Sequence, residues 1–367
     1  MKVECNGNDL SDAVARVIKA VSARSTNAVL EGIRMTAEDG TLTLTATDLE
    51  LSIEHMIRAS VVESGEVVVP GKLFGEFVKK LTAHNIVLSS GGERLKINYD
   101  RSEGEFGCYP VDQYPVVNQI EDTQHFEMKN SEFRDLVNKV AFSVCTDDAH
   151  PTLKGVLLEI AEDGVTAVAL DGYRLAKCVK PIVATTASTS IVVPARAIME
   201  ISRLVPDNDG EIKFNLHKNY LMVRIDATTV TTRLIDGEFV NYRQIVPQHF
   251  DTQVYIPKAM FEDAIDRAVL MARTEKNNYL VRFDIAQTDM TVRSHSDVGT
   301  VEENQPVKTD GADISISFNA RYFTEFLHYM NCETIVLNLT NATSACVVSP
   351  AGGLDEYIYL VLPVRSL

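Results

Sequence analysis

The sequence lacks any long apolar run. No stretch approaches the roughly 18 consecutive apolar residues that span a bilayer, and residues 1–5 lack the apolar core of a signal peptide. The six cysteines lie far apart and form no Cys-x-x-Cys pair. This spacing argues against a zinc site and against a secreted disulfide framework. The sequence therefore predicts a cytoplasmic protein with reduced thiols, no metal and no membrane partner.

Common catalytic and nucleotide-binding motifs are also missing. There is no Gly-x-Gly-x-x-Gly, Walker lysine loop, His-Glu-x-x-His or Gly-x-Ser-x-Gly. Residues 294–297 combine the residue types of a catalytic triad, but neighbours in one strand point to opposite faces. Asp48 and Asp171 resemble paired carboxylates, yet a turn at a strand end accounts for each of them better. We expect no catalytic residue and no cofactor; an acidic multidomain hydrolase is the alternative.

Positive charge is scarce in this chain. The 35 Lys and Arg residues are outnumbered by 51 Asp and Glu residues, which gives a formal net charge of −16. A uniformly acidic surface would exclude nucleic acid, because phosphates are bound by cations. The exclusion does not hold if the cations gather on one surface.

The sequence does contain a long repeat. A β-branched run, a proline, a cation and then apolar residues at helical spacing occupy residues 67–81, recur in 191–201 and recur more weakly in 314–323. Pro70, Pro194 and Phe318 take the same place at intervals of 124 residues. Proline has a fixed φ and no N–H, so it suits the first position of a helix that directly follows a strand. The period predicts three similar domains, at residues 1–122, 123–248 and 249–367.

Each predicted domain contains two helices packed on antiparallel sheet, which is an α+β architecture. The first helix of each domain is expected to begin near Asn8 or Asp9, near Asn130, and at Pro257. Strands with alternating residues are expected at 41–47, 165–170 and 290–293. The helices carry cations opposite their apolar stripes, whereas acids crowd the strands and turns. Either the helices share one positive surface, or these are ordinary solvated helix faces.

Six short stretches along the whole chain carry a family resemblance. They are LTLTATDLE (42–50), HPTLKGV (150–156), DGYRLA (171–176), LIDGEF (234–239), TEKNN (274–278) and LPVR (362–365). In this order, on a threefold repeat, they resemble the bacterial sliding clamp, the beta subunit of DNA polymerase III. The resemblance implies a DNA clamp fold of three repeated domains, and a head-to-tail homodimer that forms a closed ring.

The same resemblance implies a non-catalytic processivity factor. Helices line the hole and surround double-stranded DNA without reading its sequence, while the acidic outer wall repels DNA. The implied partners are the polymerase III alpha subunit, the clamp loader, other polymerases and repair factors, all held through linear motifs. A scaffold with this fold that does not bind DNA is the main rival interpretation.

The family also has an apolar peptide-binding cleft between its second and third domains, which takes Leu and Phe anchors. Matched residue by residue, its walls are Leu153, Leu170, Gly172, Tyr173, Arg174, Leu175, Val240, Tyr242, Ile245, Val361, Leu362, Pro363 and Val364. The chain departs from the family pattern at Val240, Gln244 and Tyr173, where Pro, Arg and His are common. We expect Leu175→Asp to abolish peptide capture and leave the dimer intact.

The resemblance also implies residues for DNA contact and for the dimer. The DNA-facing positions are Arg24, Lys72, Lys79, Lys80, His150, Arg196, Arg203, Lys276 and Arg321. His150 replaces a usual Arg and contributes charge only when it is protonated. Phe106 of the first domain, with Leu270 and Met271 of the third, correspond to the apolar joint between protomers.

Overall fold

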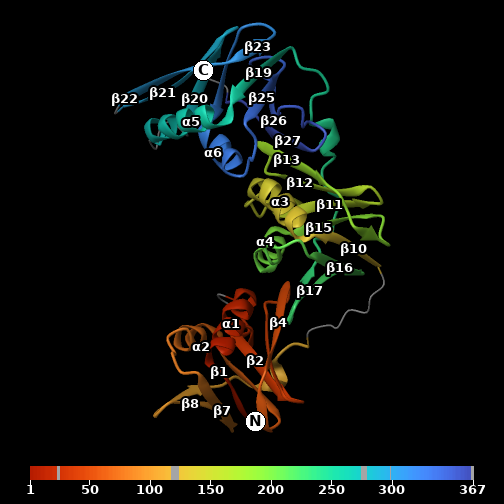
Figure 1. The fold of residues 1–367 in the computed structure, drawn as a ribbon, viewed down its shortest axis with the longest axis vertical. Helices are drawn as coiled ribbons and strands as arrows, with labels where there is room; N and C mark the ends of the chain where they lie inside the picture. Colours follow the sequence, from red (N-terminus) through yellow and green to blue (C-terminus); the bar gives the residue numbers. More distant parts are fainter. Residues whose placement is uncertain (23–24, 117–123, 274–278, 298, 365–367) are drawn as a thin grey trace. The chain divides into compact units, whose positions relative to one another are not determined.

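The chain folds into antiparallel sheets and six α-helices within residues 1–22, 25–116, 124–273, 279–297 and 299–364, which the structure describes (Figure 1). It is a computed structural model. Its contacts group into two compact units. The first contains Met1–Asn130, Ala184–Ala187 and Glu200–Leu234, and the second contains Ser131–Val183, Ser188–Met199 and Ile235–Leu367. The predicted middle domain is therefore divided between the two units.

The first unit contains two antiparallel sheets. The five-stranded sheet has the order β5-β1-β7-β8-β9, with β1 (Lys2–Asn6), β5 (Ser60–Glu63), β7 (Asn85–Gly91), β8 (Arg94–Tyr99) and β9 (Ser102–Gly107). The nine-stranded sheet has the order β14-β10-β16-β17-β18-β4-β3-β2-β6. Its strands are β2 (Gly32–Glu38), β3 (Thr41–Thr47), β4 (Leu51–Arg58), β6 (Gly65–Pro70), β10 (Gln124–Lys129), β14 (Ala184–Thr185), β16 (Glu211–His217), β17 (Tyr220–Ile225) and β18 (Thr228–Arg233).

The second unit also contains two antiparallel sheets. The nine-stranded one has the order β15-β11-β12-β13-β27-β26-β25-β19-β23, and the four-stranded one has the order β22-β21-β20-β24. Their strands are β11 (Gly155–Ala161), β12 (Gly164–Leu170), β13 (Arg174–Lys180), β15 (Thr189–Pro194), β19 (Thr252–Pro257), β20 (Leu280–Ile285), β21 (Asp289–Ser296), β22 (Gly299–Pro306), β23 (Lys308–Asp310), β24 (Ile314–Asn319), β25 (Thr334–Leu339), β26 (Cys346–Pro350) and β27 (Tyr357–Val361).

The helices pack on these sheets through apolar stripes. They are α1 (Gly7–Val17), α2 (Gly71–Val78), α3 (Asn130–Val140), α4 (Ala195–Leu204), α5 (Lys258–Ala272) and α6 (Ala320–His328). Helix α1 buries Leu10, Val14 and Val17 and contacts β3, β4 and α2. Helix α5 buries Phe261 and Ile265 and contacts β20, β21, β22 and α6. Two helices per repeat on antiparallel sheet confirm the predicted α+β class. No helix in the described part of the chain is long and apolar enough to cross a membrane.

Both nine-stranded sheets contain a joint at which strands of two successive repeats pair. In the first unit β4 pairs with β18, and in the second β13 pairs with β27. Leu51 lies opposite Thr232 in one joint, and Arg174 lies opposite Val361 in the other. Each joint joins the four-stranded half-sheet of one repeat to the five-stranded half-sheet of another. The two smaller sheets have four and five strands, and each ends in an edge strand, β22 or β9.

The repeated strand-to-helix junction is present, but two details of its prediction were wrong. Pro70 was predicted as the first helical residue, but it ends β6 and is the N-cap of α2, which begins at Gly71. In the third repeat the equivalent residue is Asn319 rather than Phe318, because β24 extends one residue further. Asn319 replaces the fixed φ of proline with a side-chain cap, which accepts a hydrogen bond from the N–H of Arg321 at 3.0 Å. Helix α1 likewise begins earlier than predicted, since Asn6 caps it through the N–H of Asn8 at 2.8 Å.

Ion pairs fasten α3 to β13. Lys180 contacts Glu132 at 2.8 Å and Asp135 at 2.6 Å, and Lys139 contacts Asp135 at 2.7 Å. Burial alone would raise the pKa of Asp135, but hydrogen bonds from Lys139 and Lys180 hold it below the ordinary value. A carboxyl with a lowered folded-state pKa stabilises the fold at neutral pH, and this contribution disappears as the pH falls through that pKa.

We therefore expect Lys180→Met to reduce the free energy of unfolding at pH 7 and to move the acid-unfolding midpoint to higher pH. At a pH below the folded-state pKa of Asp135, the destabilisation that arises from the lost Asp135 pairing should vanish. Urea titrations followed by circular dichroism at several pH values measure this. Lys177→Met on the same strand is the matched control. An equal loss of stability at neutral and strongly acidic pH would contradict the ion-pair explanation.

Candidate functional site

A tight turn between β12 and β13 organises the predicted cleft residues. The Asp171 carboxylate accepts hydrogen bonds from the backbone N–H groups of Tyr173 at 2.9 Å and Arg174 at 3.0 Å. Gly172 has φ +90°, a conformation that favours glycine, and the space around it is open. Asp48 makes the equivalent turn in the first repeat, where its carboxylate accepts from the N–H groups of Glu50 at 3.1 Å and Leu51 at 2.8 Å. Both aspartates therefore have the predicted turn role.

Arg174 is held in place by charges and rings, with only 10% of its side chain exposed. Its guanidinium donates to Asp171 Oδ2 at 2.9 Å and to the Phe142 carbonyl at 2.8 Å, and it also pairs with Glu325. The Tyr322 ring centroid lies 4.8 Å from it. Burial opposes its charge, but neighbouring Tyr359, Glu325 and Asp171 keep the pKa of Arg174 above the ordinary value. Arg174 therefore positions the turn and offers little surface to a ligand.

Below the turn lies an apolar floor. Four predicted residues, Leu153, Leu170, Leu175 and Tyr242, belong to one buried cluster. Its other buried members are Cys145, Leu157, Val168, Val192, Val347 and Leu360. Val361 is also fully buried. The structure therefore brings these residues together, but as packed core rather than as exposed wall.

Five other predicted residues, Tyr173, Val240, Ile245, Leu362 and Val364, are exposed apolar side chains, which we call the rim. The backbone N–H of Leu362 donates to the carbonyl of Tyr173 at 2.8 Å, which places the end of β27 beside the turn. Tyr173 is 64% exposed and Leu362 is 38% exposed. Val240, Ile245 and Val364 are also exposed large apolar residues of this unit, and Pro363 is half-buried. Exposed side chains of this size offer contact area to an apolar partner.

An ionic cluster that the sequence analysis missed supports the short helix Tyr242–Gln244. The Tyr242 hydroxyl donates to Glu159 Oε2 at 2.7 Å, and Arg243 donates to both oxygens of Glu159 at 2.9 and 2.7 Å. Burial and the bond to Glu159 raise the pKa of Tyr242. Together these bonds hold the segment that carries Val240 and Ile245. The contacts of Arg174 with Tyr322 and Glu325 were also missed, although Tyr322 directly follows Arg321, which the repeat had singled out.

The predicted DNA-facing cations lie at exposed positions on helices and turns. Lys72, Arg196 and Arg321 are each the second residue of a helix, in α2, α4 and α6. The others that the structure describes are Lys79, Lys80, Arg203 and His150, and all are exposed. Arg203 pairs with Glu200, and Arg321 lies 3.8 Å from Glu325. Arg24 and Lys276 lie outside the described residues, as does the 274–278 stretch.

Helix charge is balanced rather than strongly positive. The six α-helices contain nine Lys and Arg residues and ten Asp and Glu residues. The strands carry 15 Lys and Arg residues and 15 Asp and Glu residues, so helices and strands alike are close to neutral. The whole chain carries −16, so nearly all of its acidic excess lies outside the helices and strands.

The predicted dimer residues differ in exposure. Phe106 is buried against Phe74 and Phe77, with ring centroids 5.4 and 5.2 Å apart. Leu270 is an exposed large apolar residue near the end of α5. The Met271 sulfur lies 3.6 Å from the place where a Cβ of Gly299 would sit, beside the start of β22. Phe106 and Met271 therefore mark the two edge strands β9 and β22.

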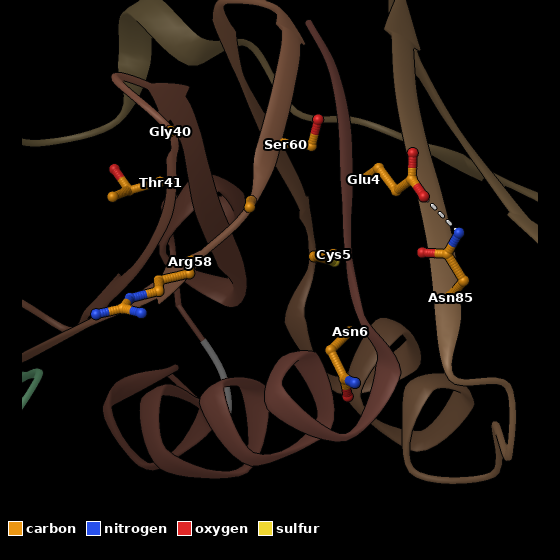
Figure 2. Close-up of a pocket in the computed structure, with 9 residues that line it drawn as sticks. Glu4, Cys5, Asn6, Gly40, Thr41, Arg58, Ser60 and Asn85 are labelled. Carbon is orange, nitrogen blue, oxygen red and sulfur yellow. Dashed lines mark hydrogen bonds between the residues drawn. The ribbon is translucent and has the colours of Figure 1, made fainter.

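A cavity of about 710 Å³ in the first unit offers no catalytic set (Figure 2). Glu4, Thr41, Arg58 and Asn85 line it, and the Asn85 amide donates to the Glu4 carboxylate. Burial raises the pKa of the Cys5 thiol to about 12, so the reactive thiolate is scarce at neutral pH.

The triad-like stretch in β21 alternates as predicted, with Ser294 and Ser296 buried and His295 exposed.

Three family models match the chain in succession. They describe the DNA polymerase III beta subunit: its N-terminal domain at residues 1–118, its central domain at 127–241 and its C-terminal domain at 243–365. Together they cover almost the whole sequence.

Relatives and solved structures agree with these models. The chain is 26% identical over 360 residues to a Staphylococcus aureus protein named beta sliding clamp, covering 95% of each. The Bacillus subtilis DNA polymerase sliding clamp matches with a TM-score of 0.95 at 25% identity. The DNA polymerase III beta subunit of Thermotoga maritima matches with a TM-score of 0.92 at 26% identity. Both structural matches cover 100% of each chain.

Proposed function

This chain belongs to the family of DNA polymerase III beta subunits, the bacterial beta sliding clamps, and we propose that two copies close head to tail into a ring around duplex DNA. Its function is that of a processivity clamp, which performs no chemistry itself. We place it in the cytoplasm as part of the polymerase holoenzyme, and we assign its domains to residues 1–122, 123–248 and 249–367.

The main support for the ring is the repeated joint, the pairing of strands from two successive repeats in one sheet. Two joints, β4 with β18 and β13 with β27, connect successive repeats inside the chain. The third joint of the same kind has no partner strand within the described residues, and its two halves are the edge strands β9 and β22. An edge strand presents unpaired N–H and C=O groups and is a template for another chain. Pairing β9 of one copy with β22 of a second copy, twice, closes a ring of six repeats.

The proposed DNA contact is electrostatic and independent of sequence. The helices are nearly neutral in an acidic chain, and the three repeat-equivalent cations Lys72, Arg196 and Arg321 occupy the same helical position. We propose that these cations, with Lys79, Lys80, His150 and Arg203, face the phosphates, and that Arg24 and Lys276 join them. Because the helix charge is balanced, topology rather than affinity would keep the ring on DNA.

The proposed partner site is the apolar rim of Tyr173, Val240, Ile245, Leu362 and Val364 over its buried floor. An apolar surface with few polar groups suits a short peptide with Leu or Phe anchors. We propose that the polymerase III alpha subunit, the clamp loader, other polymerases and repair factors bind here in turn. The rim, with the exposed Gly172 and the half-buried Pro363, would touch such a peptide, whereas Leu153, Leu170, Arg174, Leu175, Tyr242 and Val361 would support it.

Retention on closed circular DNA tests the ring. The chain is loaded onto a nicked circular plasmid with the clamp loader of the source bacterium and ATP, and the complex is separated by gel filtration. We expect a dimer that stays with the circle and is released when a restriction enzyme linearises it. A protein that stays monomeric at all concentrations and never co-elutes with the circle would refute the ring and favour a scaffold that does not bind DNA.

A further inference from the structure

The two edge strands that would meet in the ring are both acidic. Strand β9 carries Glu103 and Glu105, and strand β22 carries Glu302 and Glu303. The joints inside the chain have no such pattern. In the first, β18 contains no acidic residue, and in the second neither β13 nor β27 contains one. The edges proposed to close the ring thus differ in charge from the joints that are already closed.

The register of the ring joint follows from the two joints inside the chain. Hydrogen-bond rungs can be counted from the strand-to-helix junctions, which are equivalent in the three repeats. This count shows that Leu51 of β4, Arg174 of β13 and Gly299 of β22 are equivalent residues of the three repeats. Their partners across the joint are Thr232 of β18, Val361 of β27 and, by equivalence, Phe106 of β9. The same count across the five-stranded half-sheets makes Thr232 and Val361 equivalent residues, which agrees with the pairing seen at both internal joints, and it places Phe106 at their position. Phe106 of one copy would then lie opposite Gly299 of the other, next to Met271.

In this register Glu103 lies directly opposite Glu302, three rungs from Phe106. The equivalent rungs inside the chain are Thr229 with Glu54, and Ile358 with Lys177. Neither places two like charges together. Residues opposite each other in an antiparallel pair are on the same face and close together, so like charges there are destabilising.

Nearby cations neutralise this rung only in part. Glu302 pairs with Arg293 at 2.8 Å, but Arg293 also lies 3.3 Å from Asp284. Glu105 pairs with Arg94 at 2.7 Å, and Glu303 pairs with Arg267 at 2.7 Å. Glu103 is exposed, faces the neutral Asn98 across β8–β9, and has no ion pair among the described residues. Three of the four carboxylates therefore have an arginine of their own copy, and Glu103 has none.

We propose that carboxylate repulsion between Glu103 and Glu302 weakens the closure of the ring, so that rising ionic strength tightens the dimer. This inference rests on the proposed ring and adds the sign of its salt dependence. A joint held by complementary ion pairs would loosen as salt screens it, whereas a repulsive rung gains from screening. A ring of this kind opens most readily at low ionic strength.

Sedimentation equilibrium of the full chain at about 0.1 M and about 0.5 M NaCl tests the proposal. Added salt screens the two carboxylates from each other, because the Debye length falls from about 10 Å at 0.1 M to about 3 Å at 1 M. We expect the dimer Kd of the native chain to fall as salt rises. Glu103→Lys places an attractive pair in both joints of the ring and should lower the Kd at low salt by about tenfold. The Kd of this variant should also rise with salt. Glu103→Lys combined with Glu302→Lys restores a like-charge rung and should restore the native salt response.

Glu63→Lys on β5, at the opposite edge of the same sheet, makes the same charge change away from the joint and should leave the sign of the salt response unchanged. A native dimer that loosens with salt, or one that Glu103→Lys and Glu63→Lys tighten equally, would overturn the repulsive rung and leave the ring intact. A chain that is monomeric at every salt concentration and is not retained on circular DNA would instead overturn the ring itself.

Discussion

Replacing Arg174 with methionine should lower the free energy of unfolding by about 3–5 kcal/mol, because removing one partner of a buried ion pair leaves the opposite charge uncompensated. Two carboxylates lose their partner, Asp171 at 2.9 Å and Glu325, and the Phe142 carbonyl loses a donor at 2.8 Å. Methionine retains most of the apolar stem, so packing against Tyr322 accounts for little of the loss. The measurement is urea unfolding of the full chain.

Arg321→Met is the matched control for this prediction. Arg321 also lies near Glu325, but its side chain is 57% exposed and the two charges are 3.8 Å apart. Exposed pairs of this kind contribute about 0–1 kcal/mol. Arg174→Lys should be intermediate, since lysine keeps the charge but cannot form the same forked contacts. If Arg174→Met and Arg321→Met cost the same, the network around Arg174 would have no special structural role.

Local features of the fold were predictable because they depend on neighbouring residues. The strand-to-helix junction, the alternating strands and the Asp48 and Asp171 turns all follow from residue type and spacing within a few positions. The third junction was misplaced by one residue because Asn319 caps the helix by a side-chain hydrogen bond, which the proline pattern does not represent. A pattern that requires proline at the start of a helix thus misses a helix that an asparagine side chain caps.

The joints between repeats could not be predicted from periodicity. Alternation shows that β4 and β18 are strands, but their pairing across 173 residues, as at His55 and Thr228, is determined by tertiary structure. For this reason three domains are visible in the sequence, while contacts in the structure group into two units. The same pairing, continued to the edge strands, supports the proposed ring.

Burial was the least predictable property of the proposed peptide site. The family resemblance indicated its residues, but not which of them form its floor and which its rim. Leu175 is 1% exposed and belongs to the buried cluster, whereas Leu362 at the end of β27 is 38% exposed. Leu175→Asp is therefore a poor test of peptide capture, contrary to our expectation from the sequence. It would bury a carboxylate without a partner and destabilise the second unit.

Leu362→Asp should instead remove peptide binding without unfolding the protein. Its side chain is accessible and its backbone is held by the Tyr173 carbonyl at 2.8 Å, so the substitution keeps the local fold. A charge within an apolar contact should weaken binding by about 30-fold or more, the loss typical of an interface hot spot. Fluorescence anisotropy with a labelled peptide that carries a Leu-Phe pair measures the affinity, and urea unfolding measures the stability.

Leu49→Asp provides the comparison within the same chain. Leu49 is 59% exposed and follows Asp48 in the equivalent turn of the first repeat, so the change in surface charge and polarity is the same. Peptide affinity should be unchanged in this variant, because the rim around Tyr173 and Leu362 remains intact. Normal binding by Leu362→Asp, or equal loss in both variants, would show that the peptide does not bind at this rim. In the same urea assay Leu175→Asp should lose about 4 kcal/mol or more of stability. This loss distinguishes a residue of the buried floor from the surface that a partner touches.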